Sequence, residues 1–502
     1  MNMRRAKVVV VGGGSAGWIA ASYLNAVLNE RHPTAEVTLI EAPSIARIGV
    51  GEATVPSIRE TLSRIGIRED EFLKESDGTF KSAIAFRNWR KGANHEYLHP
   101  FDQRAHLGRG DRTAAEWLTN PARGDWASQV SILSHLAKGG RAPKAIGWPD
   151  WGSTFPYAYH MDADAFASHL SIRAKARGVG HIEARVVETV MDSESTIASL
   201  KLDDGTEIAG DLFLDCSGFA ALLTGRALNV PLVKYDEWLM CDRAVTMRVP
   251  YDVYRPERIR PYTVSTAMGA GWIWDIPLRS RRGIGYVYSS AFLSDEAAEY
   301  ELRNYEGPHA KNLAIRRLEF PVGRRAENWV GNCVAVGLSS GFVEPLESTA
   351  LYTVEAVISS LVEHLDFSDL DHSENVAVSR QAHNRRIANL YEEILDFVNL
   401  HYCTSDRSDT AFWREVTSPR RVSPGLASLL ELWRVKAPSN LDLRRPSQLF
   451  SAASYEYILF GMLQTPSGEA TATELSASMR EAVRKSLAKM PSHEDLLSHL
   501  VG

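Results

Sequence analysis

The feature that most constrains the fold lies near the N-terminus, where a short apolar run meets a glycine-rich turn. Lys7 is followed by the apolar, β-branched residues Val8 to Val11, and then directly by Gly12-Gly13-Gly14-Ser15-Ala16-Gly17. An uninterrupted run of this kind predicts a strand buried on both faces. A helix is predicted from Trp18 to about Asn29, and Glu36 to Glu41 predicts a second strand that ends in an acid. This order predicts a βαβ unit.

The spacing of the three outer glycines predicts a dinucleotide site. Gly12 permits a tight turn, Gly14 lets the backbone approach a diphosphate, and Gly17 lets the helix pack closely on the strand. The diphosphate would lie against free N–H groups at the positive end of the helix. An acid that binds ribose is expected at Glu41. The expected binding residues are Gly12, Gly14, Ser15, Ala16, Gly17 and Glu41, and the alternative is a glycine-rich turn without a ligand.

Two later segments favour FAD over NAD as the dinucleotide. Asp211 to Gly218 resembles the strand and turn that contact the dinucleotide in large FAD enzymes. Asn332 to Gly337 resembles their late strand, which contacts the flavin ribityl chain and ring. Asp215 and Gly337 are therefore further expected FAD-binding residues. No second glycine motif of this kind occurs, although some flavin hydroxylases bind NADPH without one.

Composition limits the class of protein. The chain has 502 residues, of which 44% are hydrophobic and 24% charged, as in soluble globular proteins of two or three packed units. Its net charge of -6 argues against a nucleic-acid surface. Four cysteines without paired spacing predict neither a disulfide framework nor a zinc ribbon, and no apolar stretch is long enough to span a membrane. We expect a cytoplasmic protein without a metal site.

The rest of the chain gives a coarser pattern. Tyr97 to Tyr159 is rich in Trp, Pro, Gly and His and predicts ordered loops and short elements rather than a sheet. Val186 to Leu214 predicts strands and a hairpin around Asp203-Asp204-Gly205, and Cys333 to Val336 predicts another strand. Amphipathic helices are expected from about Thr349 to Val398, and the remainder is mostly helical with breaks at prolines.

A tryptophan motif identifies a family resemblance. Gly271-Trp272-Ile273-Trp274-Asp275-Ile276-Pro277 contains W-x-W-x-I-P, which resembles the signature of flavin-dependent tryptophan halogenases. The alternative is a core strand with two aromatic residues on one face. Four other segments resemble the family in the same order, over about residues 7–400: Gly49 to Pro56, Thr79-Phe80-Lys81, His99-Pro100-Phe101, and Glu344 to Thr349.

The resemblance implies an α/β fold with an FAD-binding Rossmann-type (GR2-like) core of mixed sheet, capped by a mostly helical substrate domain. Residues 1–390 would form the FAD-binding halogenase core, with an interleaved substrate-lining segment at about residues 88–160. Residues 391–502 would form a helical C-terminal substrate region. Reduced FAD, O2 and chloride or bromide would yield hypohalous acid, and a separate NAD(P)H-dependent flavin reductase would supply FADH2. A homodimer is a further expectation.

The resemblance also assigns roles to single residues. Lys81 would hold the electrophilic halogen, and Glu347 would take the proton that the ring loses, with Glu344 as a weaker candidate. Backbone amides of Thr349 and Ala350 would bind halide, provided that the φ angle of Ala350 is negative. The remaining expected positions are Ala53 beside the flavin, Trp272 and Trp274 as a shield over it, and His99, Phe101, Phe450 and Tyr455 around the indole.

The substrate expected from the sequence is larger than an amino acid. Halogenases of free tryptophan hold its amino and carboxyl groups with a C-terminal Tyr-Tyr pair, a Glu and a Phe-Trp pair. Here the nearest stretch runs from Leu449 to Tyr457, lacks the tyrosine pair, and has Phe450 in place of the stacking Trp. Charged groups need partners, so tryptophan within a peptide, or another indole natural product, is favoured over free L-tryptophan. A flavin aromatic hydroxylase and a non-catalytic flavoprotein are the rivals from other classes.

Overall fold

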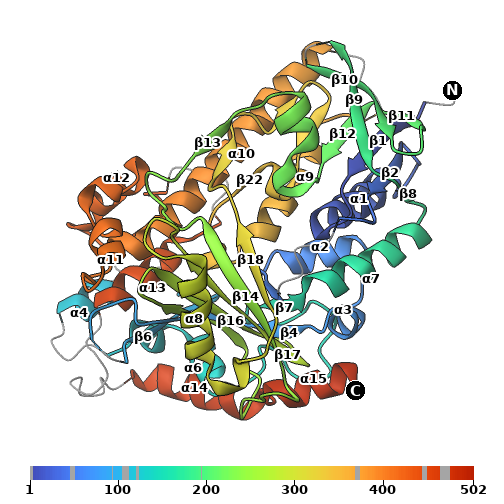
Figure 1. Ribbon diagram of the computed structural model, residues 1–502. Helices are drawn as coiled ribbons and strands as arrows, with labels where there is room; N and C mark the ends of the chain where they lie inside the picture. The colour runs from blue at the N-terminus through green and yellow to red at the C-terminus, as the bar shows by residue number, and fades with distance from the viewer. Residues whose placement is uncertain are drawn as a thin grey trace.

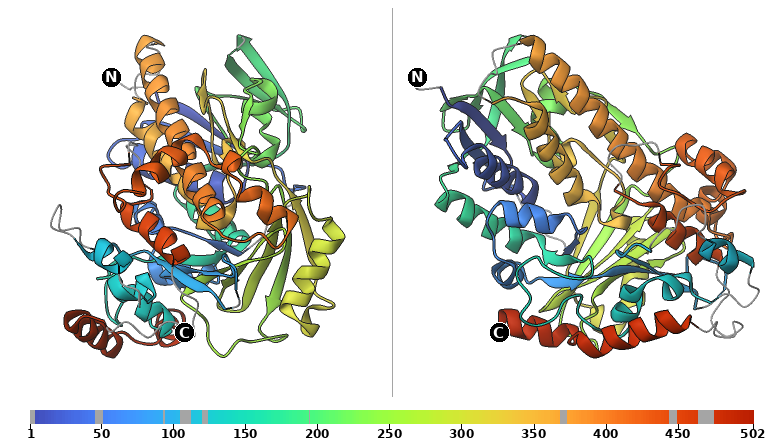
Figure 2. Two further views of the ribbon diagram at one scale, coloured as in Figure 1. Left: turned by 90° about the vertical axis from the view of Figure 1, so that its left-hand side faces the viewer. Right: turned by 180° about the vertical axis from the view of Figure 1, so that it is seen from behind.

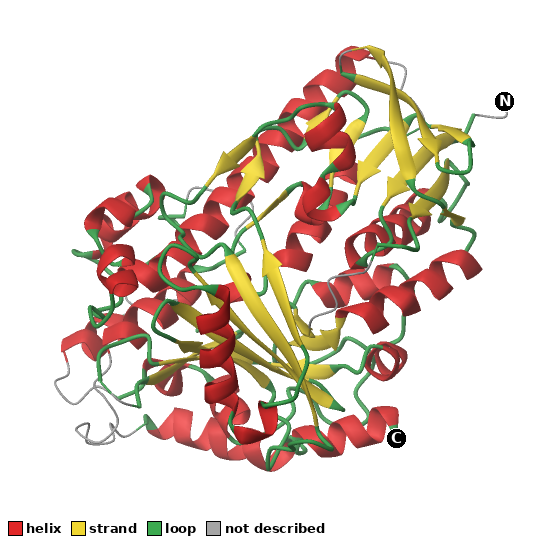
Figure 3. Cartoon of the chain, viewed as in Figure 1, coloured by secondary structure: helices red, strands yellow, loops and turns green. Residues whose placement is uncertain are grey.

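A six-stranded sheet and a seven-stranded sheet form the two halves of the molecule, and long helices connect them (Figure 1). The structure is a computed structural model that describes residues 4–45, 51–92, 94–104, 112–119, 124–193, 195–367, 373–443, 449–463 and 475–502. The chain contains both helices and strands (Figure 3), with parallel pairing around β1 (Ala6–Val11), so the expected α/β fold is confirmed.

The six-stranded sheet contains the βαβ unit predicted at the N-terminus. β1 (Ala6–Val11) lies between β2 (Ala35–Glu41) and β12 (Leu212–Asp215), parallel to both. The sheet has the order β20-β21-β12-β1-β2-β8, with β8 (Gly180–Glu183), β20 (Trp329–Val330) and β21 (Cys333–Ala335). The helix after the glycine turn is α1 (Ser15–Leu28), which begins three residues earlier than predicted.

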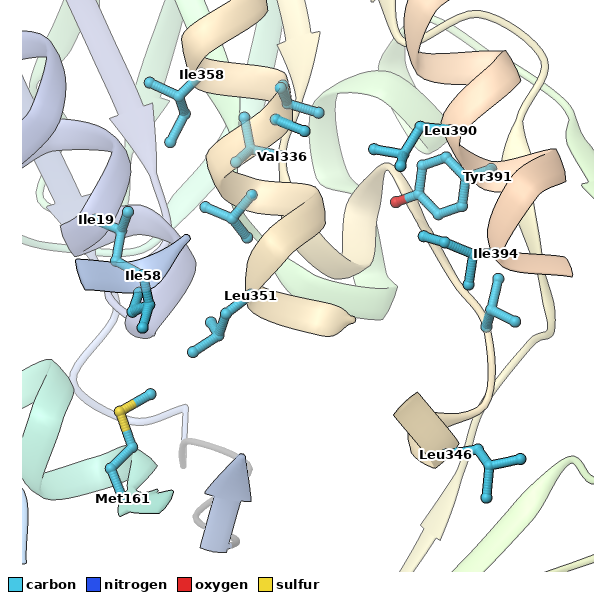
Figure 4. Packing of buried hydrophobic residues seen from close by; sticks show 14 of the residues in the cluster. Ile19, Ile58, Met161, Val336, Leu346, Leu351, Ile358, Leu390, Tyr391 and Ile394 are labelled. Atoms are coloured by element: carbon cyan, nitrogen blue, oxygen red, sulfur yellow. The ribbon is translucent and has the colours of Figure 1, made fainter. Parts of the chain in front are cut away.

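The core lies on both sides of β1, which explains its apolar run. Val8 and Val10 join one hydrophobic cluster, and Val9 and Val11 join another on the opposite face. On the first side, α1 packs against α2 (Ile58–Arg64), α7 (Ala163–Ala176) and α9 (Ala350–His364). Figure 4 shows side chains of α1, α2, α9 and α10 (Ser373–Cys403) in one cluster, among them Ile19, Ile58, Leu351 and Ile394.

The seven-stranded sheet carries the tryptophan motif. Its order is β18-β14-β17-β16-β15-β5-β6, and every pair is antiparallel except β15 with β5. The strands are β18 (Ile315–Glu319), β14 (Arg243–Pro250), β17 (Arg281–Tyr288), β16 (Gly271–Pro277), β15 (Tyr262–Ala267), β5 (Ala83–Arg87) and β6 (Glu96–Pro100). α8 (Asp295–Glu306) packs on β14 and β17.

The segment predicted to contain no sheet, Tyr97 to Tyr159, lies in a sheet at each of its ends, and the prediction is wrong there. β6 pairs with β5 and forms the edge of the large sheet, which a five-residue stretch containing His and Pro does not reveal by periodicity. The middle of the segment forms short helices, α4 (Thr113–Thr119), α5 (Trp126–Val130) and α6 (Ile132–Lys138). β7 (Ala158–Asp162) lies between β3 (Gly51–Ala53) and β4 (Thr79–Lys81) in a small sheet.

The remaining strands form small sheets beside the two large ones. The predicted hairpin is present as β9 (Val186–Ser193), β10 (Thr196–Leu202) and β11 (Glu207–Ala209). The other three-stranded sheet contains β13 (Leu232–Lys234), β19 (Gly323–Arg325) and β22 (Gly341–Phe342).

The C-terminal third is helical, as predicted. α10 (Ser373–Cys403) runs from the six-stranded sheet toward α11 (Ala411–Val416), α12 (Pro424–Trp433) and α13 (Ala452–Leu463) (Figure 2). α14 (Ala477–Lys489) contacts α6, and α15 (His493–Val501) contacts α3 (Glu69–Glu75). The domain boundary expected between residues 390 and 391 falls inside α10. The division into a core and a C-terminal substrate region therefore stays a prediction. Among the described residues, no helix is long and apolar enough to cross a membrane.

Candidate active site

The glycine turn has the geometry that a dinucleotide requires. Gly12 has φ +121°, and a Cβ atom there would lie 2.2 Å from the carbonyl oxygen of Cys216. A Cβ atom on Gly17 would lie 1.9 Å from the carbonyl oxygen of Gly12, so helix and turn touch directly. A Cβ atom on Gly14 would meet nothing within 4 Å. The open space at Gly14, beside the N-terminus of α1, fits the diphosphate of FAD.

Two residues of the expected FAD site border this turn. The carboxyl group of Glu41 lies against it, because a Cβ atom on Gly13 would come within 2.1 Å of the Glu41 Cδ atom. Gly337 has φ +69° and lies so close to α1 that an added Cβ atom would be 2.9 Å from that of Ala16. Both ends of the expected site therefore converge on the start of α1.

Asp215 has a different environment from the one that a direct cofactor contact needs. Its Oδ1 atom accepts hydrogen bonds from the amide and hydroxyl of Ser217, at 3.1 and 2.5 Å. Its Oδ2 atom accepts from the amides of Leu223 and Thr224, at 3.0 and 2.8 Å, and from the Thr224 hydroxyl at 2.8 Å. The buried carboxylate thus shapes the turn after β12, and its role toward a cofactor stays a prediction.

Lys81 is fully buried at the end of β4. Its Nζ atom donates to the carbonyl oxygen of Thr54 at 3.1 Å and to Oγ of Ser348 at 2.8 Å. Burial lowers the pKa of Lys81 to about 7, against the opposing pull of the Glu347 carboxylate. A lysine in this state has a substantial neutral fraction near pH 7, and its amine lone pair can react with an electrophile.

Glu347 is held between two histidines. Nε2 of His401 lies 2.9 Å from its Oε1 atom, and Nδ1 of His99 lies 3.2 and 3.1 Å from its Oε1 and Oε2 atoms. Burial raises the pKa of a carboxyl group, but the charge of His99 and hydrogen bonds from both histidines bring the pKa of Glu347 down to about 2. The carboxylate is therefore ionised and can accept a proton.

Glu344 has the opposite character. Its Oε2 atom accepts from the indole N–H of Trp272 at 3.1 Å and from the hydroxyl of Tyr402 at 2.5 Å. Burial raises the pKa of Glu344 to about 7, because these hydrogen bonds offset only part of the desolvation. The pKa of Glu344 thus lies above the usual carboxyl value and that of Glu347 below it, although only three residues separate them. Glu347 is the stronger candidate base because it is ionised.

The second tryptophan of the motif borders a cavity. The ring of Trp274 lies over Gly285, where a Cβ atom would come within 2.1 Å of it. A cavity of about 220 Å³ opens beside it and is also lined by Gly51, Arg248 and Arg281. Trp272 and Trp274 share one face of β16, with ring centroids 6.2 Å apart. The two rings therefore lie together on one face of the strand, and their role as a shield over the flavin stays a prediction.

Three of the four predicted indole-binding residues form one aromatic group around Phe397, and the fourth, Phe101, lies beside Lys81. The ring of Phe101 lies 5.1 Å from the Nζ atom of Lys81. Phe397 connects the others, because its ring centroid lies 5.7 Å from His99, 3.7 Å from Phe450 and 4.9 Å from Tyr455. Since Phe450 stacks on Phe397 with an interplanar angle of 13°, that face of the Phe450 ring is occupied by protein.

The expected halide site lies at the start of α9. Thr349 is the N-cap residue and Ala350 is the first helical residue, so the φ angle of Ala350 is negative, as its role requires. Both border a cavity of about 10 Å³, together with Gly341 and Thr353. A volume of this size accommodates about one water-sized occupant, beside amides that have no partner within the helix.

Three residues of the site were not identified from the sequence. Ser348 is the hydrogen-bond partner of Lys81, and His401 and Tyr402 bind the two glutamates. Consecutive residues His401 and Tyr402 occupy the last turn of α10, where a histidine is more readily explained by the helix dipole. Among the described residues, no three His, Cys, Asp or Glu side chains are grouped so that they could hold a metal ion. Gly49 and Val50 of the predicted flavin loop lie outside the described residues.

Comparisons with known proteins agree over nearly the whole chain. The sequence profile described as tryptophan halogenase matches residues 7–477. The tryptophan 6-halogenase SttH of Streptomyces toxytricini is 37% identical over 483 residues, which cover 92% of this chain and 90% of that protein.

Two solved structures extend the similarity to the fold. The tryptophan C-6 flavin-dependent halogenase from taromycin biosynthesis superposes with a TM-score of 0.89 at 34% identity, over 99% of this chain and 100% of that one. MibH, a lanthipeptide tryptophan 5-halogenase, superposes with a TM-score of 0.81 at 28% identity, over 99% of this chain and 94% of that one.

Proposed function

Because the chain belongs to the tryptophan halogenase family, we propose that it chlorinates or brominates the indole ring of tryptophan within a peptide or a larger indole compound. The observation that carries this proposal is the pairing of a buried lysine with a buried carboxylate. Lys81 donates to Ser348, the residue that follows Glu347 in the chain, and the lysine is reactive as an amine near pH 7 while the glutamate is ionised. Together they supply a holder for an electrophile and a base.

FAD would be held by the glycine turn, Glu41 and the backbone near Gly337, where the open space at Gly14 fits its diphosphate. In its reduced form, with O2 and a halide ion, it supplies the electrophilic halogen as hypohalous acid. The N-terminus of α9, at Thr349 and Ala350, would bind the halide. A separate NAD(P)H-dependent flavin reductase is the expected source of FADH2.

The halogen transfer is then performed by residues of the chain. The Lys81 amine would hold hypohalous acid by a hydrogen bond, or form an N–halogen bond with release of water. After the halogen bonds to a ring carbon, the ring is a cation that must lose the proton on that carbon. Glu347 would stabilise this cation and accept the proton.

The substrate proposal rests on the buried acid that follows Tyr455 in the sequence. Glu456, which follows Tyr455, is buried, and both of its oxygens accept from the guanidinium of Arg104, at 2.7 Å each. A carboxylate paired in this way offers nothing to the ammonium group of free tryptophan. Similar proteins are named for both substrate classes: MibH is described as a lanthipeptide tryptophan 5-halogenase, and SttH as a tryptophan 6-halogenase. Free L-tryptophan remains the alternative substrate.

The deciding experiment is a mass-spectrometric assay with FAD, a flavin reductase, NADH and either bromide or chloride. The substrates are free tryptophan, indole and a panel of tryptophan-containing peptides. A halogen isotope pattern on a peptide, with none on free tryptophan, supports the proposal, and the reverse result assigns the free amino acid. Because an oxygenated product would indicate a hydroxylase, NADPH oxidation by the chain alone is measured in parallel. FAD binding without any product would indicate a non-catalytic flavoprotein.

A further inference from the structure

The contacts of His401 determine where its ring protons are. Its Nδ1 atom lies 2.8 Å from the carbonyl oxygen of Phe397, and its Nε2 atom lies 2.9 Å from Oε1 of Glu347. A carbonyl oxygen and a carboxylate oxygen only accept hydrogen bonds, whereas a neutral imidazole carries a single N–H. His401 and Glu347 must therefore share one proton more than a neutral histidine and a carboxylate hold together.

The position of that proton follows from the other contacts of Glu347. His99 directs its Nδ1 atom at both carboxylate oxygens, and two N–H donors favour the ionised form of a carboxyl group. We propose that His401 is a positioning residue, a buried imidazolium that holds Glu347 as a carboxylate and fixes the oxygen that takes the substrate proton. The pair is neutral overall, which makes its burial tolerable.

Charged and aromatic groups around the pair are consistent with this state. Glu347 faces Lys81 from β4, Tyr97 and His99 from β6, and His401 from α10. The ring of His401 contacts those of Phe86 and Trp89, at 4.9 and 6.0 Å between centroids, and that of Phe397. An aromatic ring stabilises a nearby cation where its face is turned toward the charge. No second carboxylate pairs with His401 among the described residues.

The proposal rests on the proposed halogenase function for its consequence in the reaction. Oε1 of Glu347 faces both histidines, whereas Oε2 faces His99 alone, so Oε2 is the atom that accepts the proton from the halogenated ring carbon. The C–H bond breaks, its electron pair returns to the ring, and the proton bonds to Oε2. Without His401, burial would act with less opposition and raise the pKa of Glu347. The carboxyl group would then stay protonated up to a higher pH and be inactive as a base there.

The state of His401 is measured on the chain without any cofactor, by NMR with 15N-labelled histidine. At pH 8 the signals of His401, assigned from His401→Gln, should show protons on both ring nitrogens. In Glu347→Gln the side-chain amide can donate to Nε2, so His401 should become neutral with its proton on Nδ1. A neutral His401 in the unsubstituted chain at pH 8 would overturn the proposal, as would a ring that Glu347→Gln leaves unchanged.

His383 is the matched control on the same helix. It is buried, its Nε2 atom lies 2.7 Å from the amide oxygen of Asn328, and burial lowers its pKa to about 3. It should carry one proton at pH 8 in the same spectra, before and after Glu347→Gln. A doubly protonated His383 would show that burial on α10 alone, rather than the carboxylate, sets the ring charge.

The kinetic test uses His401→Gln in the halogenation assay. We expect kcat to fall by about tenfold or more at pH 7 and to recover as the pH rises and Glu347 ionises, while KM for the substrate stays unchanged. A loss that is equal at every pH would assign His401 a purely structural role. If no substrate is halogenated by the unsubstituted chain, the proposed function fails, and the NMR measurement still decides the charge of the pair.

Discussion

The Nζ atom of Lys81 lies 2.8 Å from Oγ of Ser348, although 267 residues separate them in sequence. Ser348 has φ +61° and occupies the turn between the short helix that ends at Glu347 and the start of α9. The lysine is therefore tied to the one segment that carries both the candidate base and the candidate halide site. An electrophile held by Lys81 would therefore lie near Ser348, the residue that follows Glu347.

Replacement of Lys81 should separate flavin chemistry from halogenation. Lys81→Ala should abolish product, while reoxidation of FADH2 by O2 continues, because the holder of the electrophile is lost. Lys81→Met keeps the length and removes a buried amine, so it should have the same effect without lowering the melting temperature. Product by mass spectrometry and FADH2 reoxidation by absorbance are measured on both. Persistent product in either variant would remove Lys81 from the mechanism.

The pH dependence of halogenation should show the neutral amine of Lys81. Burial lowers the pKa of Lys81 to about 7, so the neutral fraction rises about tenfold per pH unit below 7 and levels off above it. Product formation with FADH2 in excess should therefore increase with pH through about 7. A flat profile from pH 6 to 9 would mean that the amine is not the reactive form.

Glu347→Gln should lower turnover by about 10²-fold or more, because the amide cannot take the proton from the ring. Glu355→Gln is a matched control, since Glu355 is also a buried glutamate and lies on α9, with its Oε2 atom accepting from Thr61 at 3.0 Å. The control should keep its turnover. Single-turnover rates of product formation are compared at pH 8, and equal rates for Glu347→Gln and the unsubstituted chain would contradict the assigned role.

Local structure, such as the glycine turn, could be predicted from the sequence. Contacts between segments far apart in the sequence could not. The spacing from Gly12 to Gly17 determines its own turn, so the βαβ unit was predicted to within a few residues. One partner of Glu347 and one of Glu344 come from the last turn of α10, and only the packing of that helix determines which of its side chains face the site. The edge strand β6 was missed for a related reason, because its pairing with β5 rather than its own pattern makes it a strand.

Glu344 should make the stability of the chain depend on pH. Its folded pKa of about 7 lies above the model-peptide value near 4.5, so the folded state binds more protons between these values and loses stability as the pH rises from about 4.5 to 7. Glu344→Gln removes this dependence, while its amide oxygen can still accept from Trp272 and Tyr402. Relative to the unsubstituted chain, the variant should gain up to about 3 kcal/mol between pH 5 and pH 8. Denaturant unfolding at both pH values measures the gain, and a constant difference would show that Glu344 is ionised throughout.

The glycine turn offers a pair of substitutions that distinguish binding from folding. A Cβ atom on Gly14 meets no protein atom within 4 Å, and the φ angle of Gly14 is an ordinary -79°, so Gly14→Ala should fold with an unchanged melting temperature. Its methyl group would occupy the space expected for the diphosphate and should weaken FAD binding by about tenfold or more, a cost of about 1.4 kcal/mol.

Gly17→Ala is the matched change three residues later. Its Cβ atom would lie 1.9 Å from the backbone oxygen of Gly12, so α1 would have to move away from β1 and the melting temperature should fall. Thermal unfolding of the chain without cofactor and FAD titration by fluorescence separate the two effects. If Gly14→Ala binds FAD as tightly as the unsubstituted chain, the diphosphate does not approach the backbone at Gly14. The open space at Gly14 would then need another occupant. Gly12 and Gly17, by contrast, are explained by close contacts within the protein.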